Sequence, residues 1–317
     1  MTVKSEYHLP EKIVIGTRGS PLALWQANRV KELIVNVSKD IHMTLEIIRT
    51  TGDWSPSDGE CSLNAVQGGK ALFAKEIEES LLDNKIDIAV HSMKDMEVDL
   101  PEGLVIPFML PRASAGDVVL SNDVQNIYSL PDGCVVGTVS PRRAAFLHNK
   151  RPDLRVVPMR GNVETRLQKL KDGQVGATIL AQAGLDRLGV IYDAESVINP
   201  SDMLPAVGQG AIGIETRISD VNDLLFMNQF SCIKTMLCVE CERSVLRAIS
   251  GSCHTPVGVH ATLSDGVLSV KACLLSLDGA QKYEEYESHD VSCLEEANDL
   301  GKKVGESLRL KVPEGIL

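Results

Sequence analysis

The chain has 317 residues, of which 44% are hydrophobic and 24% are charged, a balance that excludes a disordered or fibrous protein. Its formal net charge of −11 argues against a general nucleic-acid surface. No apolar run approaches the ~20 residues that a membrane span needs, and the length predicts two or three domains.

The first predicted elements are a buried strand at 13–16 and a helix that follows it. Ser20 is expected to cap this helix and Pro21 to lie in its first turn, with the helix running to about Val37. Its inner side is expected to carry Leu22, Trp25, Val30, Leu33 and Ile34.

The next segment predicts a strand at 44–50, with Leu45 and Ile47 on one face, and then a long loop at 51–69. An amphipathic helix at 71–84 and a strand at 86–90 follow. The sequence His91-Ser92-Met93-Lys94-Asp95 follows at the carboxyl end of this strand.

Alternation of strands and helices continues through the middle of the chain. Strands are expected at 117–120, 134–137, 154–157 and 177–181, with helices after Pro141, over 163–170 and around Leu185. This order predicts α/β architecture with parallel sheets, whose ligands bind at the carboxyl ends of the strands. Arg18, Asp95, Arg142 and Arg160 all follow such strands, so we expect them to share a cleft.

The pattern changes after residue 233. A helix at 240–249, strands at 257–261 and 268–275 and a final helix at 294–308 predict a smaller α+β domain.

Four turn motifs carry arginine in this acidic chain. They are Thr17-Arg18-Gly19-Ser20-Pro21, Ser140-Pro141-Arg142-Arg143, Met159-Arg160-Gly161-Asn162 and Glu164-Thr165-Arg166. Guanidinium groups pair bidentately with carboxylates and phosphates, so the four motifs together indicate a focused anion pocket rather than ordinary surface arginines.

Asp95 is the candidate catalytic carboxylate, because a carboxylate beside cations can stabilise a developing positive charge or carry a proton. The alternative for Lys94-Asp95 is a helix-capping aspartate next to a solvated lysine. His91 is interpreted as a hydrogen-bonded strand-end histidine rather than as a catalyst.

The eight cysteines show no disulfide-framework spacing, and together with the absence of a secretory signal they indicate free thiols in the cytoplasm. Cys253 lies in a loop of small residues at 250–256, which suits a nucleophile or a covalent attachment point.

Two further motifs have alternatives that we consider weaker. Cys238 and Cys241 could bind zinc with Cys232, Cys253 and His254, but the usual second ligand pair is absent and no metal is expected. The G-x-G-x-x-G match at 208–213 precedes a strand-like run, the wrong order for a dinucleotide site, and is interpreted as a glycine-rich domain crossing.

Taken together, the motifs resemble the porphobilinogen deaminase (hydroxymethylbilane synthase) family. The resemblance rests on residues 17–26, 68–73, 91–95, 151–154, 160–166 and 204–210, and on the position of the Cys253 loop. It departs from the family pattern at Ala71, Met96, Glu97, Val139, Pro141 and Ser252, without loss of an essential group.

The resemblance implies two α/β lobes similar to those of periplasmic binding proteins and a smaller C-terminal α+β domain. The first lobe comprises residues 1–110 with 209–230, the second lobe 115–205, and the third domain, which bears the cysteine loop, 233–317.

The resemblance also implies the activity. Family enzymes join four porphobilinogen molecules head to tail, releasing ammonia each time, on a dipyrromethane held covalently by the cysteine, here Cys253. Linear hydroxymethylbilane is then released for tetrapyrrole biosynthesis. Asp95 would stabilise the cationic azafulvene-like species formed when ammonia leaves.

The remaining site residues follow from the same resemblance. Those implied to bind the carboxylate arms of cofactor and substrate are Arg18, Ser20, Lys94, Thr138, Ser140, Arg142, Arg143, Arg160, Arg166 and Arg187, while Lys70 and Phe73 are candidates for a lid. We expect a cytoplasmic transferase that acts as a monomer, without nucleic-acid or membrane partners. The rival hypothesis is a non-catalytic two-lobed anion-binding module.

Overall fold

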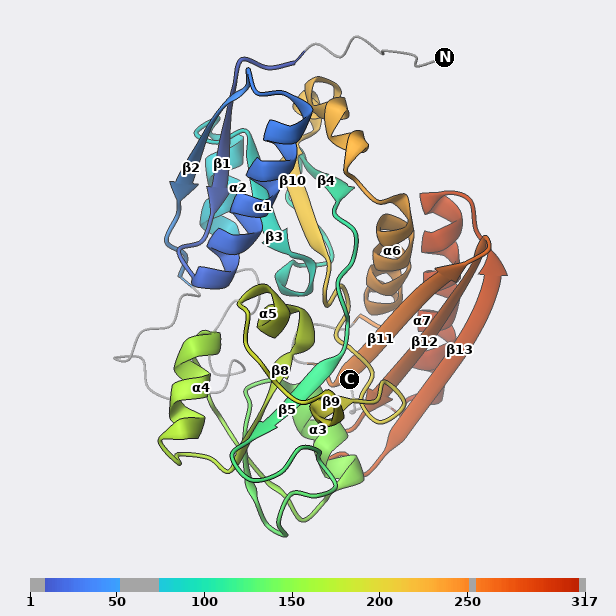
Figure 1. Cartoon of the computed structure of the whole chain (residues 1–317). Helices are drawn as coiled ribbons and strands as arrows, with labels where there is room; N and C mark the ends of the chain where they lie inside the picture. The colour runs from blue at the N-terminus through green and yellow to red at the C-terminus, as the bar shows by residue number, and fades with distance from the viewer. Residues whose placement is uncertain (1–8, 52–73, 251–254, 314–317) are drawn as a thin grey trace. The chain divides into compact units, whose positions relative to one another are not determined.

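The computed structural model describes residues 9–51, 74–250 and 255–313 of the chain (Figure 1). These residues divide into two compact units. The first unit takes residues 9–51, 74–112 and 211–235, and the second takes the described residues of 113–210 and 236–317.

The first unit is built on a five-stranded sheet in the order β2-β1-β3-β10-β4. The strands are β1 (Lys12–Thr17), β2 (His42–Ile47), β3 (Ile88–Ser92), β4 (Leu104–Met109) and β10 (Ile212–Arg217). β1 runs parallel to β2 and β3, whereas β10 runs antiparallel to β3 and β4. The expected parallel pairing therefore holds for β1, β2 and β3 but not for β10, which enters the sheet from the second unit and not through a crossover helix of its own unit.

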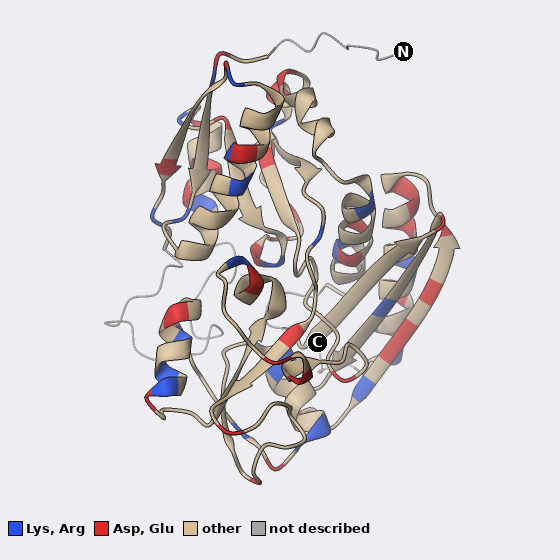
Figure 2. Cartoon of the chain, viewed as in Figure 1, with Lys and Arg blue, Asp and Glu red and all other residues tan. Residues whose placement is uncertain are grey.

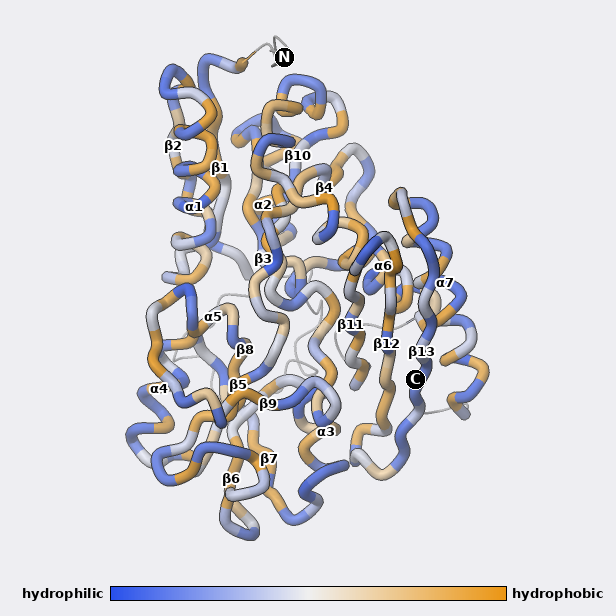
Figure 3. Tube along the Cα trace, turned by 45° about the vertical axis from the view of Figure 1, so that its right-hand side comes forward, coloured by the Kyte–Doolittle hydropathy of each residue, from blue (hydrophilic) through white to orange (hydrophobic). Residues whose placement is uncertain are grey.

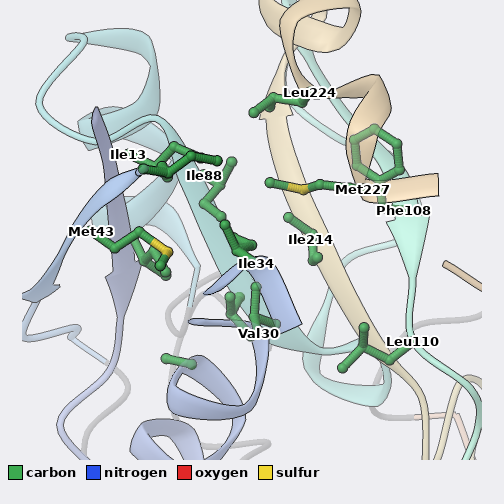
Figure 4. Packing of buried hydrophobic residues seen from close by; sticks show 14 of the residues in the cluster. Ile13, Val30, Ile34, Met43, Ile88, Phe108, Leu110, Ile214, Leu224 and Met227 are labelled. Atoms are coloured by element: carbon green, nitrogen blue, oxygen red, sulfur yellow. The ribbon is translucent and has the colours of Figure 1, made fainter. Parts of the chain in front are cut away.

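Two helices cover opposite faces of this sheet. They are α1 (Pro21–Val37) and α2 (Lys75–Leu82), and two 3-10 segments, η4 (Met93–Asp95) and η6 (Ile218–Gln229), complete the unit. Because side chains alternate along a strand, Ile13 and Ile88 pack with Val30 and Ile34 of α1, as Figure 4 shows. Ala89 instead packs on the α2 face, in a cluster that includes Ile77 and Leu81.

The structure corrects three expectations in this unit. Trp25 does not lie on the inner side of α1 but is 38% exposed, and the buried residue in its place is Gln26. β2 begins two residues before the predicted strand and ends at Ile47, which is exposed because β2 is an edge strand. α2 begins at Lys75, and the predicted loop and start of this helix lie mostly outside the described residues.

The second unit contains another mixed five-stranded sheet, in the order β7-β6-β8-β5-β9. Its strands are β5 (Asp117–Ser121), β6 (Val135–Gly137), β7 (Arg155–Val157), β8 (Ala177–Ala181) and β9 (Val197–Ile198). Its helices are α3 (Pro141–Lys150), α4 (Val163–Lys171), α5 (Gln182–Arg187) and the short η5 (Ala194–Ser196). β5 runs antiparallel to β8, which again differs from the parallel pattern expected.

A three-stranded antiparallel sheet and two helices form the rest of the second unit. The elements are α6 (Ile233–Ala248), β11 (Val257–Ser264), β12 (Val267–Leu275), β13 (Lys282–Asp290) and α7 (Leu294–Lys311). α6 begins seven residues before the predicted helix. α6 and α7 pack closely because Gly305 has no Cβ, which would lie 2.6 Å from the carbonyl oxygen of Val245.

β13 was not predicted, because its sequence lacks the apolar alternation of a half-buried strand. Figure 3 shows it as mostly hydrophilic, and Figure 2 shows acidic residues along it. Three of these are paired with lysines: Glu284 with Lys271 and Lys282, Glu287 with Lys303, and Glu285 with Lys311.

One apolar core runs through both parts of the second unit. Cys273 and Leu275 of β12 pack in the same cluster as Phe146 and Leu147 of α3. Next to this cluster, the amide of Asn149 donates to the carbonyl oxygen of Gly279 at 2.9 Å. The expected boundary between a second lobe and a third domain stays a prediction.

Candidate active site

The turn between β1 and α1 presents Arg18. Ser20 caps α1 as predicted, since its Oγ accepts a hydrogen bond from the amide of Ala23 at 3.3 Å, and Pro21 lies in the first turn. Thr17 Oγ1 donates to the carbonyl oxygen of the same residue, Ala23, at 3.3 Å. Arg18 is thus held between a buried strand end and a capped helix.

Asp95 is positioned by the end of β3. This strand leads into η4, which carries Lys94 and Asp95, and the amide of Met93 donates to the carbonyl oxygen of Ala211 at 3.1 Å. Ser92 accepts a hydrogen bond of 2.8 Å from buried Gln26, which ties the strand end to α1.

The two segments form a pocket within the first unit. Its polar lining is Arg18, Ser20, Gln26, His91, Ser92 and Asp95, and Val90 and Met96 add apolar walls. Lys94 lies half-buried in η4, and the lining of this pocket, drawn from the described residues, does not include it. The structure therefore brings together three of the predicted residues, Arg18, Ser20 and Asp95.

His91 has the buried partner that the sequence predicted for it. Its Nε2 lies 2.9 Å from Oε2 of Glu215, whose side chain is fully buried. Burial, followed by the charge of Glu215, raises the pKa of neighbouring Glu78 to about 7. The strand end beneath the pocket is thus rich in carboxylates.

In the second unit, Arg142 and Arg143 lie in the first turn of α3 and are buried. Ser140 caps the helix, accepting from the amide of Arg143 at 3.3 Å. Arg142 Nη2 lies 2.7 Å from Oδ2 of Asp117, and Arg143 Nη2 lies 2.8 Å from Oδ1 of the same carboxylate. The two arginines are 4% and 6% exposed, so this is a buried ion cluster.

Asp117 lies at the centre of this cluster. The arginines hold its pKa well below the usual range although burial alone would raise it. Gln209 donates to Oδ1 of Asp117 at 3.1 Å, and Arg142 Nη1 donates to the carbonyl oxygen of Leu204 at 2.6 Å. Among the described residues, Arg142 Nε is buried without a hydrogen-bond partner.

The other predicted residues of the second unit lie in α4, in α5 and in the segments that follow β6 and β7. Thr138 Oγ1 accepts from the amide of Ser140 at 3.2 Å. Arg166 Nε donates to the carbonyl oxygen of Gly161 at 2.8 Å, and Arg160 is 8% exposed. Burial lowers the pKa of Arg187 to about 10.

Three candidates lie outside the described residues. They are Cys253, the expected attachment point, and the lid candidates Lys70 and Phe73. For the zinc alternative, no group of three or more His, Cys, Asp or Glu side chains that could hold a metal occurs in residues 9–51, 74–250 and 255–313. Within these ranges Cys238 and Cys241 are buried in α6, and burial raises the pKa of Cys241.

The glycine-rich segment at 208–213 leads into strand β10, as predicted, and not into a helix. Gly210 has φ +87°, and a Cβ there would lie 2.6 Å from the carbonyl oxygen of Ala113, so glycine is required. Buried Glu242 accepts hydrogen bonds of 2.8 Å from the amides of Gly208 and Ala261, fixing this segment to α6 and β11.

Two family models match most of the chain. The first, described as "Porphobilinogen deaminase, dipyromethane cofactor binding domain", matches residues 13–223. The second, described as "Porphobilinogen deaminase, C-terminal domain", matches residues 236–309. The chain belongs to the porphobilinogen deaminase family. It is accordingly an enzyme of the transferase class.

Individual members of the porphobilinogen deaminase family are similar over nearly the whole chain. The enzyme of Chloroherpeton thalassium is 39% identical over 302 residues, covering 95% of each chain. The chloroplastic enzyme of Oryza sativa is 42% identical over 310 residues, 96% of this chain and 85% of its own. The enzyme of Nitratidesulfovibrio vulgaris is 44% identical over 274 residues, 86% of this chain and 84% of its own.

Solved structures with a more distant likeness include a periplasmic binding protein and a methionine-binding protein. One is an arginine transport protein from Legionella pneumophila, 14% identical, with a TM-score of 0.39 and coverage of 69% of this chain and 92% of its own. The other is the methionine-binding protein MetQ, also 14% identical, with a TM-score of 0.40 and coverage of 70% and 90%.

The sequence did not predict the buried acidic residues that pair with the site residues of this porphobilinogen deaminase family member. Asp117 pairs with Arg142 and Arg143, and Glu215 contacts His91, yet neither acidic partner lay in a predicted site motif. The available signal was a charged residue next to an apolar run, as in Asp117-Val118-Val119-Leu120 and Ile212-Gly213-Ile214-Glu215. A charged residue inside a buried strand requires a partner, although the sequence does not say which one.

Proposed function

We propose that this enzyme is a hydroxymethylbilane synthase in which Asp95 is the catalytic residue. It condenses four porphobilinogen molecules head to tail with release of ammonia, and then releases linear hydroxymethylbilane for tetrapyrrole biosynthesis. The observation that carries the assignment of Asp95 is its place in the pocket at the end of β3, with Arg18 and Ser20 across the same pocket.

The charges of the substrate explain why both signs are needed in this pocket. Porphobilinogen carries an aminomethyl group and two carboxylate arms. Departure of ammonia breaks the carbon–nitrogen bond and leaves a cation, which a nearby carboxylate stabilises. Asp95 provides that charge and takes up the ring proton lost when the next carbon–carbon bond forms, while the guanidinium of Arg18 and the hydroxyl of Ser20 bind a carboxylate arm.

We assign Lys94 and the residues of the second unit to the other carboxylate arms of cofactor and growing chain. The latter are Thr138, Ser140, Arg142, Arg143, Arg160, Arg166 and Arg187. Their donors fit a polyanion: the buried Nε of Arg142 has no hydrogen-bond partner within the described part of the chain, and burial already lowers the pKa of Arg187. A carboxylate bound at either arginine would add a further counter-charge to a buried cation.

The dipyrromethane, joined through Cys253, supplies when bound the pyrrole to which the first substrate unit is added. We place its carboxylates against the arginines of the second unit. Lys70 and Phe73 are proposed to cover the site.

We further propose three domains: residues 1–110 with 209–230, 115–205, and 233–317. The division of the chain at Arg112–Ala113 and at Gly210–Ala211 supports a discontinuous first domain. For location and assembly we propose a cytoplasmic monomer whose partner is the small-molecule substrate, without nucleic-acid or membrane partners. Across the described residues, the search for helices long and apolar enough to cross a membrane finds none.

Intact mass of the purified, denatured protein tests the proposed cofactor. A covalent two-pyrrole adduct is expected on the peptide containing Cys253, and a Cys253→Ser variant should lack it. Cys293→Ser provides the matched control, because Cys293 is exposed at the start of α7 and should leave the adduct unchanged. An unmodified chain that also gains no mass and releases no ammonia with porphobilinogen would favour the anion-binding module.

A further inference from the structure

A buried histidine–glutamate contact adjoins the pocket of the first unit. His91 and Glu215 have side-chain exposures of 6% and 0%, and Nε2 of the histidine lies 2.9 Å from Oε2 of the glutamate. In the antiparallel pairing of β3 with β10, His91 faces Gly213 and Ala89 faces Glu215. Both side chains therefore project from the sheet face that α2 covers.

The pair determines which ring nitrogen carries hydrogen. When Glu215 is ionised it can only accept hydrogen bonds, and Nε2 of His91 then donates to it. In the neutral ring, Nδ1 is then an acceptor. Within the described residues the one hydrogen bond of the His91 ring is that of Nε2, and His91 is among the residues that line the pocket containing Asp95.

The charged groups around the pair are mostly acidic. Glu78 of α2 interacts electrostatically with both His91 and Glu215, Glu97 acts on Glu78, and Asp95 and Arg18 line the pocket itself. The pKa of Glu78 is raised by burial first, and then by the charges of Glu215 and Glu97. Such surroundings favour a ligand group that carries hydrogen and positive charge.

We propose that His91 is a substrate-binding residue whose Nδ1 accepts a hydrogen bond from a nitrogen of porphobilinogen, and that Glu215 fixes the tautomer that makes this possible. The pyrrole N–H and the aminomethyl group are the substrate's nitrogen donors. Asp95 and His91 thus act as two acceptors on one pocket, while Glu215 is a positioning residue. This inference rests on the proposed function.

The Glu215→Gln variant tests the inference, because the amide is isosteric but can serve the ring as donor or as acceptor. We expect the KM for porphobilinogen to rise about tenfold, the scale of one hydrogen bond to a charged group, with kcat changed much less. Nitrogen NMR of labelled histidine should show Nδ1 of His91 unprotonated in the native enzyme and a mixture of tautomers in the variant. Loss of the His91 signals in a His91→Gln variant assigns them.

Two variants separate this role from a structural one. Thr216→Val removes a hydrogen bond of 2.9 Å from the same strand and should lower Tm without changing KM or the ring signals. Glu215→Asp keeps the negative charge and should restore most of the wild-type tautomer and KM. If Glu215→Gln fails to fold, the KM for porphobilinogen is measured in His91→Gln instead, where the same rise is expected.

A folded Glu215→Gln enzyme with wild-type KM and a wild-type Nδ1 signal would overturn the inference. An Asp95→Asn variant measured alongside tests the proposed role of Asp95 separately from that of His91. If ammonia release survives in that variant, the proposed role of Asp95 fails. If it is lost while Glu215→Gln behaves as wild type, only the role of His91 fails.

Discussion

The pocket of the first unit and the arginine cluster of the second unit differ in the sign of their excess charge. In the pocket region, Asp95, Glu78 and Glu215 are accompanied by Arg18 and His91, and the pKa of Glu78 is raised to about 7. In the cluster, the single carboxylate of Asp117 faces two guanidinium groups, and its pKa is lowered. Excess negative charge suits a site where a cation forms, and excess positive charge suits a site for carboxylate arms.

The largest effect should come from removing the carboxylate of the pocket. We expect Asp95→Asn to lower the rate of ammonia release about 10³-fold, because the amide neither stabilises a cation nor takes up a proton. Release of ammonia and formation of hydroxymethylbilane measure this, and intact mass verifies that the cofactor is still attached. Asp83→Asn, an exposed change of the same charge in the same unit, should leave the rate unchanged.

Removing the carboxylate of the cluster should act on stability instead. Asp117→Asn leaves two buried guanidinium groups without their counter-charge, so the free energy of unfolding should fall by about 3 kcal/mol. Urea denaturation measures the loss. Asp153→Asn breaks a surface pair with Arg151 of the same unit, and a loss as large as that of Asp117→Asn would contradict the special role of burial.

The pH dependence of the cluster follows from the lowered pKa of Asp117. Its ionised form contributes stability fully above the unfolded pKa of about 4, and the contribution is lost as the pH falls toward the folded value. The difference in unfolding free energy between wild type and Asp117→Asn should therefore be constant from about pH 8 to 5 and shrink below about pH 4. Urea titrations at several pH values measure it; a difference that grows in acid would reverse the assigned sign.

The smallest effect is expected at Glu78, where the sign is opposite. Its folded pKa of about 7 is raised, so its contribution to stability is present below the unfolded value and is lost as the pH rises through 7. Because the side chain is partly solvated, we expect Glu78→Gln to stabilise the protein by only about 1 kcal/mol at pH 8. The gain should disappear near pH 4, and the same urea titrations would show a pH-independent gain if the charge were not responsible.

Local signals in the sequence predicted much of this fold. Ser20-Pro21 and Ser140-Pro141 mark the starts of α1 and α3, because cap and first-turn residues act within one turn of the helix. β8 was predicted at its observed bounds from its apolar run alone. Elements whose strand character comes only from their neighbours, such as β13, were missed.

The candidate site was predictable to the extent that its residues lie in short motifs. Arg18, Ser20 and Asp95 were chosen from two motifs, and the structure places them on one pocket. The pairing of Arg142 with Asp117 was not predictable, because 25 positions separate the two residues and only the antiparallel sheet order brings them together. Likewise, Trp25 was assigned to the inner side of α1 by hydrophobicity, whereas Gln26 is buried there by its hydrogen bond to Ser92.

The position of β10 between β3 and β4 affects how the nascent chain can fold during translation. β4 is complete at residue 109, but its neighbour in the sheet spans residues 212–217. At about 5–20 residues per second, translation needs roughly 5–20 s to reach it, and during this interval β3 and β4 lack the strand that joins them. The first unit therefore completes its sheet only after the ribosome has made residues 113–210, which belong to the second unit.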